Sequence, residues 1–534
     1  MKLKSSALYF EIHPSRSKPI GYIRNSYRED GKVRHQTVAK LHGIPLPQLQ
    51  AMKTAFDGKS ISVADIVITD GKEYGASATL CALAKKIGLD KIIYSRSESW
   101  VNCALAMIIG RIIYQGSKLS LSRATDISHL WEICGVEGEV DVDKHCYEAM
   151  DELYSRQDLI QKKLANKHFQ DGSLILYDIT SSYFEGEYED TDLVTYGYNR
   201  DKKRGKKQIV IGLICTKEGC PVAVEVFSGN TSDKTTVVDK IDEIKQRYGI
   251  SDFIFVGDRG MLTQKNIDER PETLNITGLT HAKIKELCGH DKVQLSMFDE
   301  DTGTEVVLPE SPGIRYILRK NPVLKIEEQE TRSSLIEKTE AMLKEIATPK
   351  KKTDDKTLAA RAAKIFVRYK TEKYFTWDIV DTKIQYSHKE SVIADEEQYD
   401  GLYVIKSNVP EKLMSILEVV EAYKSLINVE IAFRNMKTVQ LEMRPIYHHN
   451  DDRIKAHVFI CMLAYYLLWH MNCSLKELYK EDTKKYTHQH VIEVLKTQQK
   501  FVLQVGDTGI QSHTVAHPTQ LQDRIQNMVL ETTV

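Results

Sequence analysis

Two short apolar segments of this chain each place an aspartate where the segment ends. Residues 174–179 carry Asp178, and residues 252–258 end on Asp258. Short apolar runs rich in β-branched and aromatic residues are typical of buried strands. A carboxylate at such a position is costly to bury unless it is paired, hydrogen-bonded or bound to a cation. The pattern restricts the chain to folds in which a buried sheet presents acids at its strand ends.

The segments around these aspartates predict how the strands are arranged. Two further strands are predicted at residues 208–216 and 221–227, and helices at 234–248 and 263–270. Three consecutive strands followed by helix, strand and helix are typical of a mixed sheet with helices on its faces. In such a sheet the first and fourth strands can be neighbours. Asp178 and Asp258 would then lie close together.

Two carboxylates at that separation cannot both stay ionised without a cation between them. A site made only of carboxylate oxygens suits Mg²⁺ or Mn²⁺ better than it suits zinc. Taken singly, each acid has another explanation. Asp178 can cap the following loop through Thr180 or Ser181, and Asp258 can form an Asx turn before the next helix. The metal-site hypothesis therefore depends on the two strands being adjacent.

A third acid lies in a segment, residues 410–437, that predicts one strong helix. Five of its side chains follow one another at steps of four, three, four and three residues, hence on one face: Tyr423, Ile427, Glu430, Arg434 and Lys437. Glu430 and Arg434 can form an i,i+4 surface ion pair. Apolar neighbours at 429 and 431–433 argue instead that Glu430 is not freely solvated. The spacing alone leaves both explanations open.

The charge of the chain is balanced overall and uneven locally. Its 74 Lys and Arg against 75 Asp and Glu give a net charge of −1, which argues against a uniformly basic nucleic-acid-binding surface. Residues 1–53, however, hold ten basic residues against three acids, and residues 136–152 hold seven acids against one lysine. A loop at 199–207 contains Asp201 and six basic residues, namely Arg200, Lys202, Lys203, Arg204, Lys206 and Lys207. Such basic segments favour phosphate contacts, with a solvated surface as the alternative.

Composition excludes several other classes of protein. The longest apolar run, residues 458–469, is twelve residues long, and a membrane span needs about 20. The first residues carry no apolar segment of the secretory-signal type. The nine cysteines are scattered without a C-x-x-C pair, which predicts reduced thiols in a cytoplasmic protein and no zinc ribbon.

Taken together, these segments resemble the DDE transposases of bacterial and archaeal insertion sequences, which have an RNase H-like catalytic core. The matching text is Y-D-I-T-S-S-Y-F-E-G at 177–186, Y-G-Y-N-R-D-K-K-R-G-K-K-Q-I-V-I-G-L at 196–213, V-E-V-F-S-G-N-T-S-D at 224–233, V-G-D-R-G-M at 256–261, D-G-L-Y-V-I-K-S-N-V-P at 400–410 and the helix of Glu430. The resemblance implies that Asp178, Asp258 and Glu430 are the catalytic, metal-binding carboxylates. Mg²⁺ or Mn²⁺ would be the cofactor, with two ions bound.

One branch of the family has Y-(2)-R-(3)-E-(6)-K around the glutamate. Tyr423 and Lys437 fit this register and would bind DNA phosphate, but Leu426 stands at the arginine position. Arg434 is a candidate to supply that charge. The interval between Asp258 and Glu430 resembles the insertion that this branch places before its catalytic helix, which is largely β-stranded in the relatives; here a partly β domain is expected.

The resemblance implies a mixed α/β, multi-domain chain. The expected parts are a basic N-terminal β arm at 1–55, a helical DNA-end-binding region at 60–170, the RNase H-like core at 173–274 and 406–475, an insertion domain at 275–405 and a helical tail at 476–534. The implied partners are double-stranded DNA, as terminal inverted repeats and target, and a second copy in a homodimer, with no membrane. The implied location is the prokaryotic cytoplasm, at the nucleoid. A nuclease without strand transfer and a catalytically silent DNA-binding derivative are the alternatives.

Overall fold

The computed structural model describes residues 8–13, 19–58, 66–201, 203, 205–232, 244, 246–250, 252–259, 272–289, 293–300, 303–347, 353–505 and 510–531. The chain forms two compact units. Unit 1 holds the residues up to Gln157, Thr438–Met443 and those from Asp452 onward. Unit 2 holds Asp158–Lys437 and Arg444–Asp451. Asp178, Asp258 and Glu430 all belong to unit 2.

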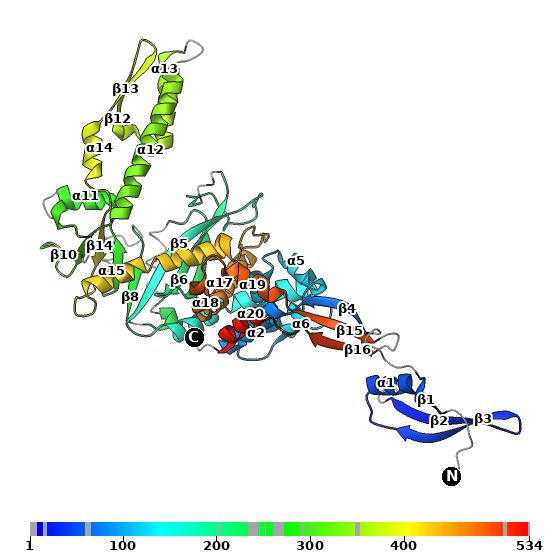
Figure 1. Cartoon of the computed structure of the whole chain (residues 1–534). Helices are drawn as coiled ribbons and strands as arrows, with labels where there is room; N and C mark the ends of the chain where they lie inside the picture. Colours follow the sequence, from blue (N-terminus) through cyan, green and yellow to red (C-terminus); the bar gives the residue numbers. More distant parts are fainter. Residues whose placement is uncertain are drawn as a thin grey trace. The chain divides into compact units, whose positions relative to one another are not determined.

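Unit 2 is built on a mixed eight-stranded sheet in the order β10-β11-β14-β9-β8-β5-β6-β7 (Figure 1). Only the pairs β5–β8 and β8–β9 are parallel among the described strands. The strands are β5 (Ser173–Tyr183), β6 (Gln208–Thr216), β7 (Pro221–Ser228), β8 (Phe253–Gly257), β9 (Leu274–Gly278), β10 (Thr304–Val307), β11 (Arg315–Lys320) and β14 (Leu402–Ser407). The four predicted strands are confirmed, and so is the adjacency of the first and fourth. The two helices predicted between and after them lie largely outside the described residues.

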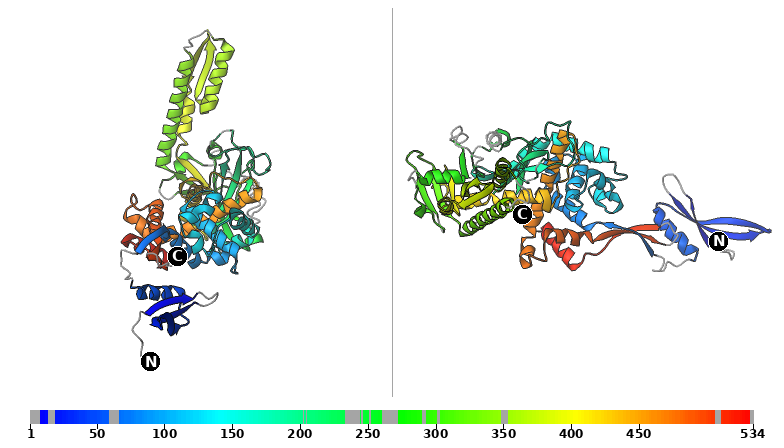
Figure 2. Two further views of the ribbon diagram at one scale, coloured as in Figure 1. Left: turned by 90° about the vertical axis from the view of Figure 1, so that its right-hand side faces the viewer. Right: turned by 90° about the horizontal axis from the view of Figure 1, so that it is seen from above.

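A helical arm within unit 2 has a hydrophobic core of its own. Helices α12 (Pro322–Ala347) and α13 (Asp355–Tyr369) lie side by side and pack on the hairpin of β12 (Phe375–Val380) and β13 (Lys383–His388) (Figure 2). The buried side chains between them include Leu343, Phe366 and Phe375. Strands β10, β11 and β14, by contrast, extend the main sheet. Two shorter helices complete this part of the chain, α11 (His281–Gly289) and α14 (Glu390–Glu397).

The single helix predicted at 410–437 is wrong in detail, because the structure divides it into three parts. These are α15 (Ile416–Lys424), α16 (Ile427–Arg434) and the π-helix η6 (Asn435–Val439). A capping box between Ser415 and Glu418 starts α15. The hydroxyl of Ser425 donates to the carbonyl of Ala422 at 2.6 Å, a bond that competes with helical geometry at the break.

Unit 1 begins with a three-stranded antiparallel sheet of β1 (Leu8–His13), β2 (Ile20–Glu29) and β3 (Lys32–Leu41). Asp30 and Gly31 form the turn with φ of 52° and 78°, as a two-residue hairpin of type I′ requires. The small N-terminal β unit is therefore confirmed. It is followed by α1 (Leu46–Phe56), which the sequence analysis did not predict.

The remainder of unit 1 is mostly helical. Its helices are α2 (Gly75–Lys86), α3 (Leu89–Ile93), α4 (Ser99–Ile113), α5 (Lys118–Ser122), α6 (Leu130–Ile133), α7 (Glu148–Ser155), α17 (Asp451–Ser474), α18 (Lys476–Glu481), α19 (His488–Lys496) and α20 (Gln520–Glu531), and α8 (Gln157–His168) leads into unit 2. Strand β4 (Ile66–Glu73) pairs with β15 (Gln499–Val505), which pairs with β16 (Ile510–Val515). Helix α17 is long and apolar enough to cross a membrane, but 89% of its most apolar window is buried in the protein. It is a core helix.

Candidate active site

Asp178 and Asp258 lie on adjacent strands of the sheet. The strand end expected near residue 179 is wrong, because β5 continues to Tyr183 through its pairing with β6 and Asp178 lies within the strand, whereas Asp258 directly follows β8. The parallel register of β5 and β8 pairs Tyr177 with Gly257, so Asp178 and Asp258 come immediately after this pair. Asp178 is half-buried, whereas Asp258 is exposed. The expected adjacency of the two acids is a consequence of the strand order, which puts β5 beside β8.

Burial and neighbouring acids both disfavour the ionised form of Asp178. Its pKa is raised to about 7, mainly by burial and in addition by the charges of Asp258 and Glu430. A hydrogen bond from the backbone N–H of Ile179 and the charge of Arg200 act in the opposite direction. Three carboxylates thus share one electrostatic environment, which a bound cation would stabilise in the ionised form.

Glu430 reaches this environment from a helix that packs across the sheet. Helix α16 contacts β5 and β6 through a buried face that includes Val429, Ala432 and Phe433. Glu430 itself is exposed. The expectation that its apolar neighbours shield it is therefore wrong, because those neighbours point toward the sheet and leave Glu430 on the open side. The donor set of three carboxylates fits a hard divalent ion such as Mg²⁺.

Tyr423, at the end of α15, lies beside the same acids. Burial raises the pKa of its hydroxyl, and the charges of Asp258 and Glu430 act in the same direction. The side chain of Arg259 forms a hydrogen bond with Tyr423, which lowers that pKa. Sequence analysis did not single out Arg259. Its position directly after Asp258 was the one feature of the sequence that could have indicated a place in the site.

Gly278, the last residue of β9, makes room for this tyrosine. A Cβ atom at Gly278 would clash with the Tyr423 hydroxyl and lie 2.9 Å from Cγ of Arg259. We expect Gly278→Ala to displace Tyr423, to lower the free energy of unfolding by about 1–3 kcal/mol and to weaken DNA binding. Gly289→Ala is the matched control, because a Cβ there meets nothing within 4 Å. Thermal melting and end-DNA binding of both variants test this; equal losses would contradict the packing argument.

Lys437 is buried rather than on the exposed face that carries Arg434. Its side chain is directed inward by the π-helical turn η6, and it is 8% exposed. Nζ donates to Oγ1 of Thr180 at 3.2 Å and to Oδ1 of Asp201 at 2.7 Å. Burial lowers the pKa of Lys437, Asp201 raises it, and the nearby cations Arg444 and Arg200 lower it. The single helical face expected from the spacing is wrong for Lys437.

Leu426 stands where the related branch carries arginine, and it is 8% exposed. In this chain the position therefore contributes to packing at the junction of α15 and α16. Arg434 lies on the exposed side of α16, as Glu430 does.

The basic loop at 199–207 is only partly engaged with the site. The backbone N–H of Arg200 donates to Oγ of Ser181 at 3.0 Å, and the charge of Arg200 acts on Asp178. Lys206 pairs with Glu185, and Lys207 donates to the carbonyl of Tyr188. Lys203 is exposed, while Lys202 and Arg204 lie outside the described residues. Among the described basic residues of this loop, Arg200 is the one whose charge acts on Asp178.

Two residues that the sequence analysis gave no DNA-binding role join Lys437. The sequence analysis counted Asp201 only as the one acid of the basic loop. In the structure, its Oδ2 accepts a hydrogen bond from NH1 of Arg444 at 3.0 Å. The guanidinium of Arg444 lies 4.4 Å from the ring centroid of Tyr183. Their sequence positions carried no signal, because the contact joins the loop before β6 to the segment after η6.

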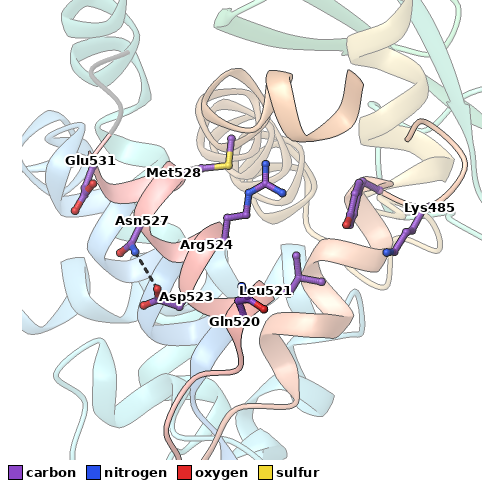
Figure 3. A pocket seen from close by; sticks show the side chains of 9 residues that line it. Lys485, Gln520, Leu521, Asp523, Arg524, Asn527, Met528 and Glu531 are labelled. Carbon is purple, nitrogen blue, oxygen red and sulfur yellow. Dashed lines mark hydrogen bonds between the residues drawn. The ribbon is translucent and has the colours of Figure 1, made fainter. Parts of the chain in front are cut away.

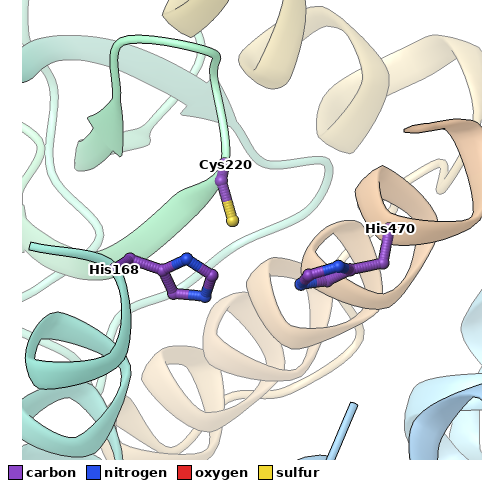
Figure 4. Close-up of side chains that lie close together, drawn as sticks. All are labelled: His168, Cys220 and His470. Carbon is purple, nitrogen blue, oxygen red and sulfur yellow. The ribbon is translucent and has the colours of Figure 1, made fainter. Parts of the chain in front are cut away.

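Other clusters of polar side chains lie elsewhere. His168 and Cys220, both of unit 2, place ligand-capable atoms within 4.8 Å of each other, and burial lowers the pKa of His168 to about 4 (Figure 4). His470, labelled with them, belongs to α17 of unit 1. A pocket of unit 1 is lined by α20 and by Lys485 and Tyr486 (Figure 3). Its Arg524 is held in an ion pair with Glu481.

Comparison with known protein families agrees with this site. Residues 170–467, more than half of the chain, match the family model described as Transposase DDE domain. No curated protein matches the chain. The matched range contains the eight-stranded sheet and all three carboxylates. The chain therefore belongs to the Transposase DDE domain family, a family of polynucleotidyl transferases, and is a DNA-binding transposase.

Proposed function

We propose that the chain is the transposase of an insertion sequence, which cleaves DNA at the element's ends and joins them to target DNA. One observation carries the assignment of the site. Asp178 and Asp258 follow a directly paired position of two parallel strands, and Glu430 is near enough to raise the pKa of Asp178. Convergence of three acids from distant sequence positions is what phosphoryl transfer with divalent ions needs.

The catalytic core is proposed to be RNase H-like. In support, β7, β6 and β5 are successively antiparallel, and β8 and β9 continue parallel to β5. The proposed core parts, 173–274 and 406–475, supply β5 to β8 and the helix of Glu430, and β9 (Leu274–Gly278) directly follows the first part. The arm of α12, α13 and the β12–β13 hairpin, with its separate core, supports an insertion within 275–405. The regions 1–55, 60–170 and 476–534 are proposed to serve as basic arm, end-binding helices and tail, and the enzyme to act as a cytoplasmic, nucleoid-associated homodimer.

The residues around the acids have distinct proposed roles. Asp178, Asp258 and Glu430 would hold two Mg²⁺ or Mn²⁺ ions. When bound, such ions would supply activation of the attacking oxygen and charge stabilisation of the leaving oxygen in an in-line displacement at phosphorus. Tyr423, Lys437 and Arg434 would bind strand phosphates near these acids. The loop residues Arg200, Lys202, Lys203, Arg204, Lys206 and Lys207 would hold the DNA backbone farther along. The main contribution of the protein to catalysis would be to hold the scissile phosphate in position between these groups.

Incubation with Mg²⁺ and DNA that carries the gene's own flanking inverted repeats tests this function. We expect nicking at the repeat ends followed by joining of the 3′-ends to a second DNA. Nicking without joining would support a nuclease instead. Binding without nicking would support a catalytically silent DNA-binding derivative. The three convergent carboxylates argue against that outcome, because DNA binding alone does not require them. A duplex of the same length with scrambled repeats is the control.

A further inference from the structure

One acid of the basic loop lies between two cations that the sheet holds in place. Oδ1 of Asp201 accepts from Nζ of Lys437 at 2.7 Å, and Oδ2 accepts from NH1 of Arg444 at 3.0 Å. An ammonium and a guanidinium that bind the two oxygens of one anion form the arrangement used for carboxylate and phosphate recognition.

Both cations are anchored on β5, the strand that carries Asp178. Lys437 also donates to Thr180 at 3.2 Å, and Arg444 stacks over Tyr183 at 4.4 Å. The side chains of Lys437 and Arg444 are 9% and 16% exposed. The cations are therefore part of a built, partly enclosed site. Asp201 enters it from a turn of the loop between β5 and β6, so its carboxylate can leave without disrupting the sheet.

Two cations share one carboxylate at this place, because Lys437 and Arg444 both bond to Asp201. The charge of Arg200 also acts on Lys437. Asp201 is the acid bonded to both Lys437 and Arg444 among the described residues. A strand phosphate presents several strong acceptor oxygens and so can satisfy more of these donors than Asp201 does.

We propose that Lys437, Arg444 and Thr180 form a binding site for a DNA phosphate, which Asp201 occupies in the DNA-free chain and leaves when the strand enters. This rests on the proposed transposase function, because Thr180 follows Asp178 by two residues and so places the phosphate beside the proposed catalytic acids. It adds Arg444 to the DNA contacts. It also makes Asp201 a competitor of DNA within a loop that is otherwise basic.

The test measures binding of the full-length chain to a fluorescent duplex that carries the flanking inverted repeat, without divalent metal so that no strand is cut. Asp201→Asn keeps the shape of the side chain and removes its charge, and we expect it to bind about tenfold more tightly. Arg444→Gln should bind about tenfold more weakly, with the slope of log affinity against log salt reduced by about one. Equal or weaker binding by Asp201→Asn would overturn the proposal.

Glu286→Gln is the control, because it removes one acid from an exposed ion pair with Lys283 elsewhere in unit 2 and should bind like the unaltered chain. Thermal melting shows whether each variant is folded. If Asp201→Asn does not fold, the affinity and salt dependence of Arg444→Gln still test the proposed phosphate site. A duplex with a 5′-phosphate and one with a 5′-hydroxyl distinguish a terminal phosphate from an internal one. If the unaltered chain neither binds nor cuts the repeats, the proposed function fails. If it does both and Asp201→Asn gains nothing, only the role of Asp201 fails.

Discussion

Glu430→Gln should lose Mg²⁺-dependent cleavage of end DNA by about a thousandfold or more and keep its affinity for that DNA. The substitution preserves the size of the side chain and removes the negative charge that a divalent ion requires. Removal of one group that stabilises the charge of a transition state costs about 10²–10³ in rate, and loss of an ion would cost at least as much. Because Glu430 is exposed, no buried packing is disturbed.

The measurement is the initial rate of nicking on duplex with the inverted repeats, alongside binding to the same duplex. Glu421→Gln is a matched control, since Glu421 is an exposed acid of α15 outside the proposed site. It should cleave like the unaltered enzyme. Cleavage by Glu430→Gln at an undiminished rate would rule out the assignment of Glu430 as a metal ligand.

Asp178→Asn should be inactive and, without metal, more stable than the unaltered chain at alkaline pH. The pKa of Asp178 is raised to about 7, mainly by burial, from an ordinary value of 3.8. The folded state therefore binds a proton that the unfolded state has lost between about pH 4 and pH 7. The stability associated with this group is fully present below about pH 4 and is lost as the pH rises through 7.

Asparagine cannot ionise, so the substitution removes this loss. After discount for solvent near the site, we expect a gain of about 1–3 kcal/mol at pH 8 and little difference at pH 4. Denaturant unfolding in EDTA at the two pH values measures it. Added Mg²⁺ should stabilise the unaltered chain at pH 8 far more than the variant. A variant that is less stable at pH 8 than the unaltered chain would show that Asp178 is held as an ion by the protein alone.

Stability and activity are thus expected to oppose each other at Asp178. A carboxylate crowded by Asp258 and Glu430 is unfavourable in the free chain, and the same crowding favours the binding of cations. Active sites commonly carry such local costs. The surrounding sheet tolerates the cost because β6, beside β5, is buried along its whole length.

Local sequence patterns were sufficient for the elements that build the core of the site. The apolar runs before Asp178 and Asp258 predicted β5 and β8. The order of strands and helices allowed these two strands to be neighbours, since few topologies are open to a mixed sheet, and the structure shows that they are. The N-terminal β arm was expected at 1–55, and the structure shows that its β2–β3 hairpin turns at Asp30 and Gly31, whose positive φ angles suit an Asp-Gly turn.

Other elements depended on contacts between distant segments. Within the helical region expected at 60–170, the chain forms α5, a 3₁₀ turn at Arg123–Asp126 and α6 in close succession, and not one continuous helix. Strand β4 was missed because its partner β15 lies near the other end of the sequence. Hydrophobic periodicity reports only on near neighbours, so pairing over such separations leaves no local signal.

The sequence by itself predicted the family, the strands β5 and β8 and the three acids proposed as metal ligands, because a carboxylate on or directly after an apolar strand is costly to bury without a partner. Only the tertiary structure decided how the basic residues are used. It buried Lys437 through a π-helical turn, packed Leu426 inside and joined Asp201 to Arg444. Charge counts along a chain cannot reveal such pairs, because electrostatic energy depends on distance in space and on burial, and both are set by the fold.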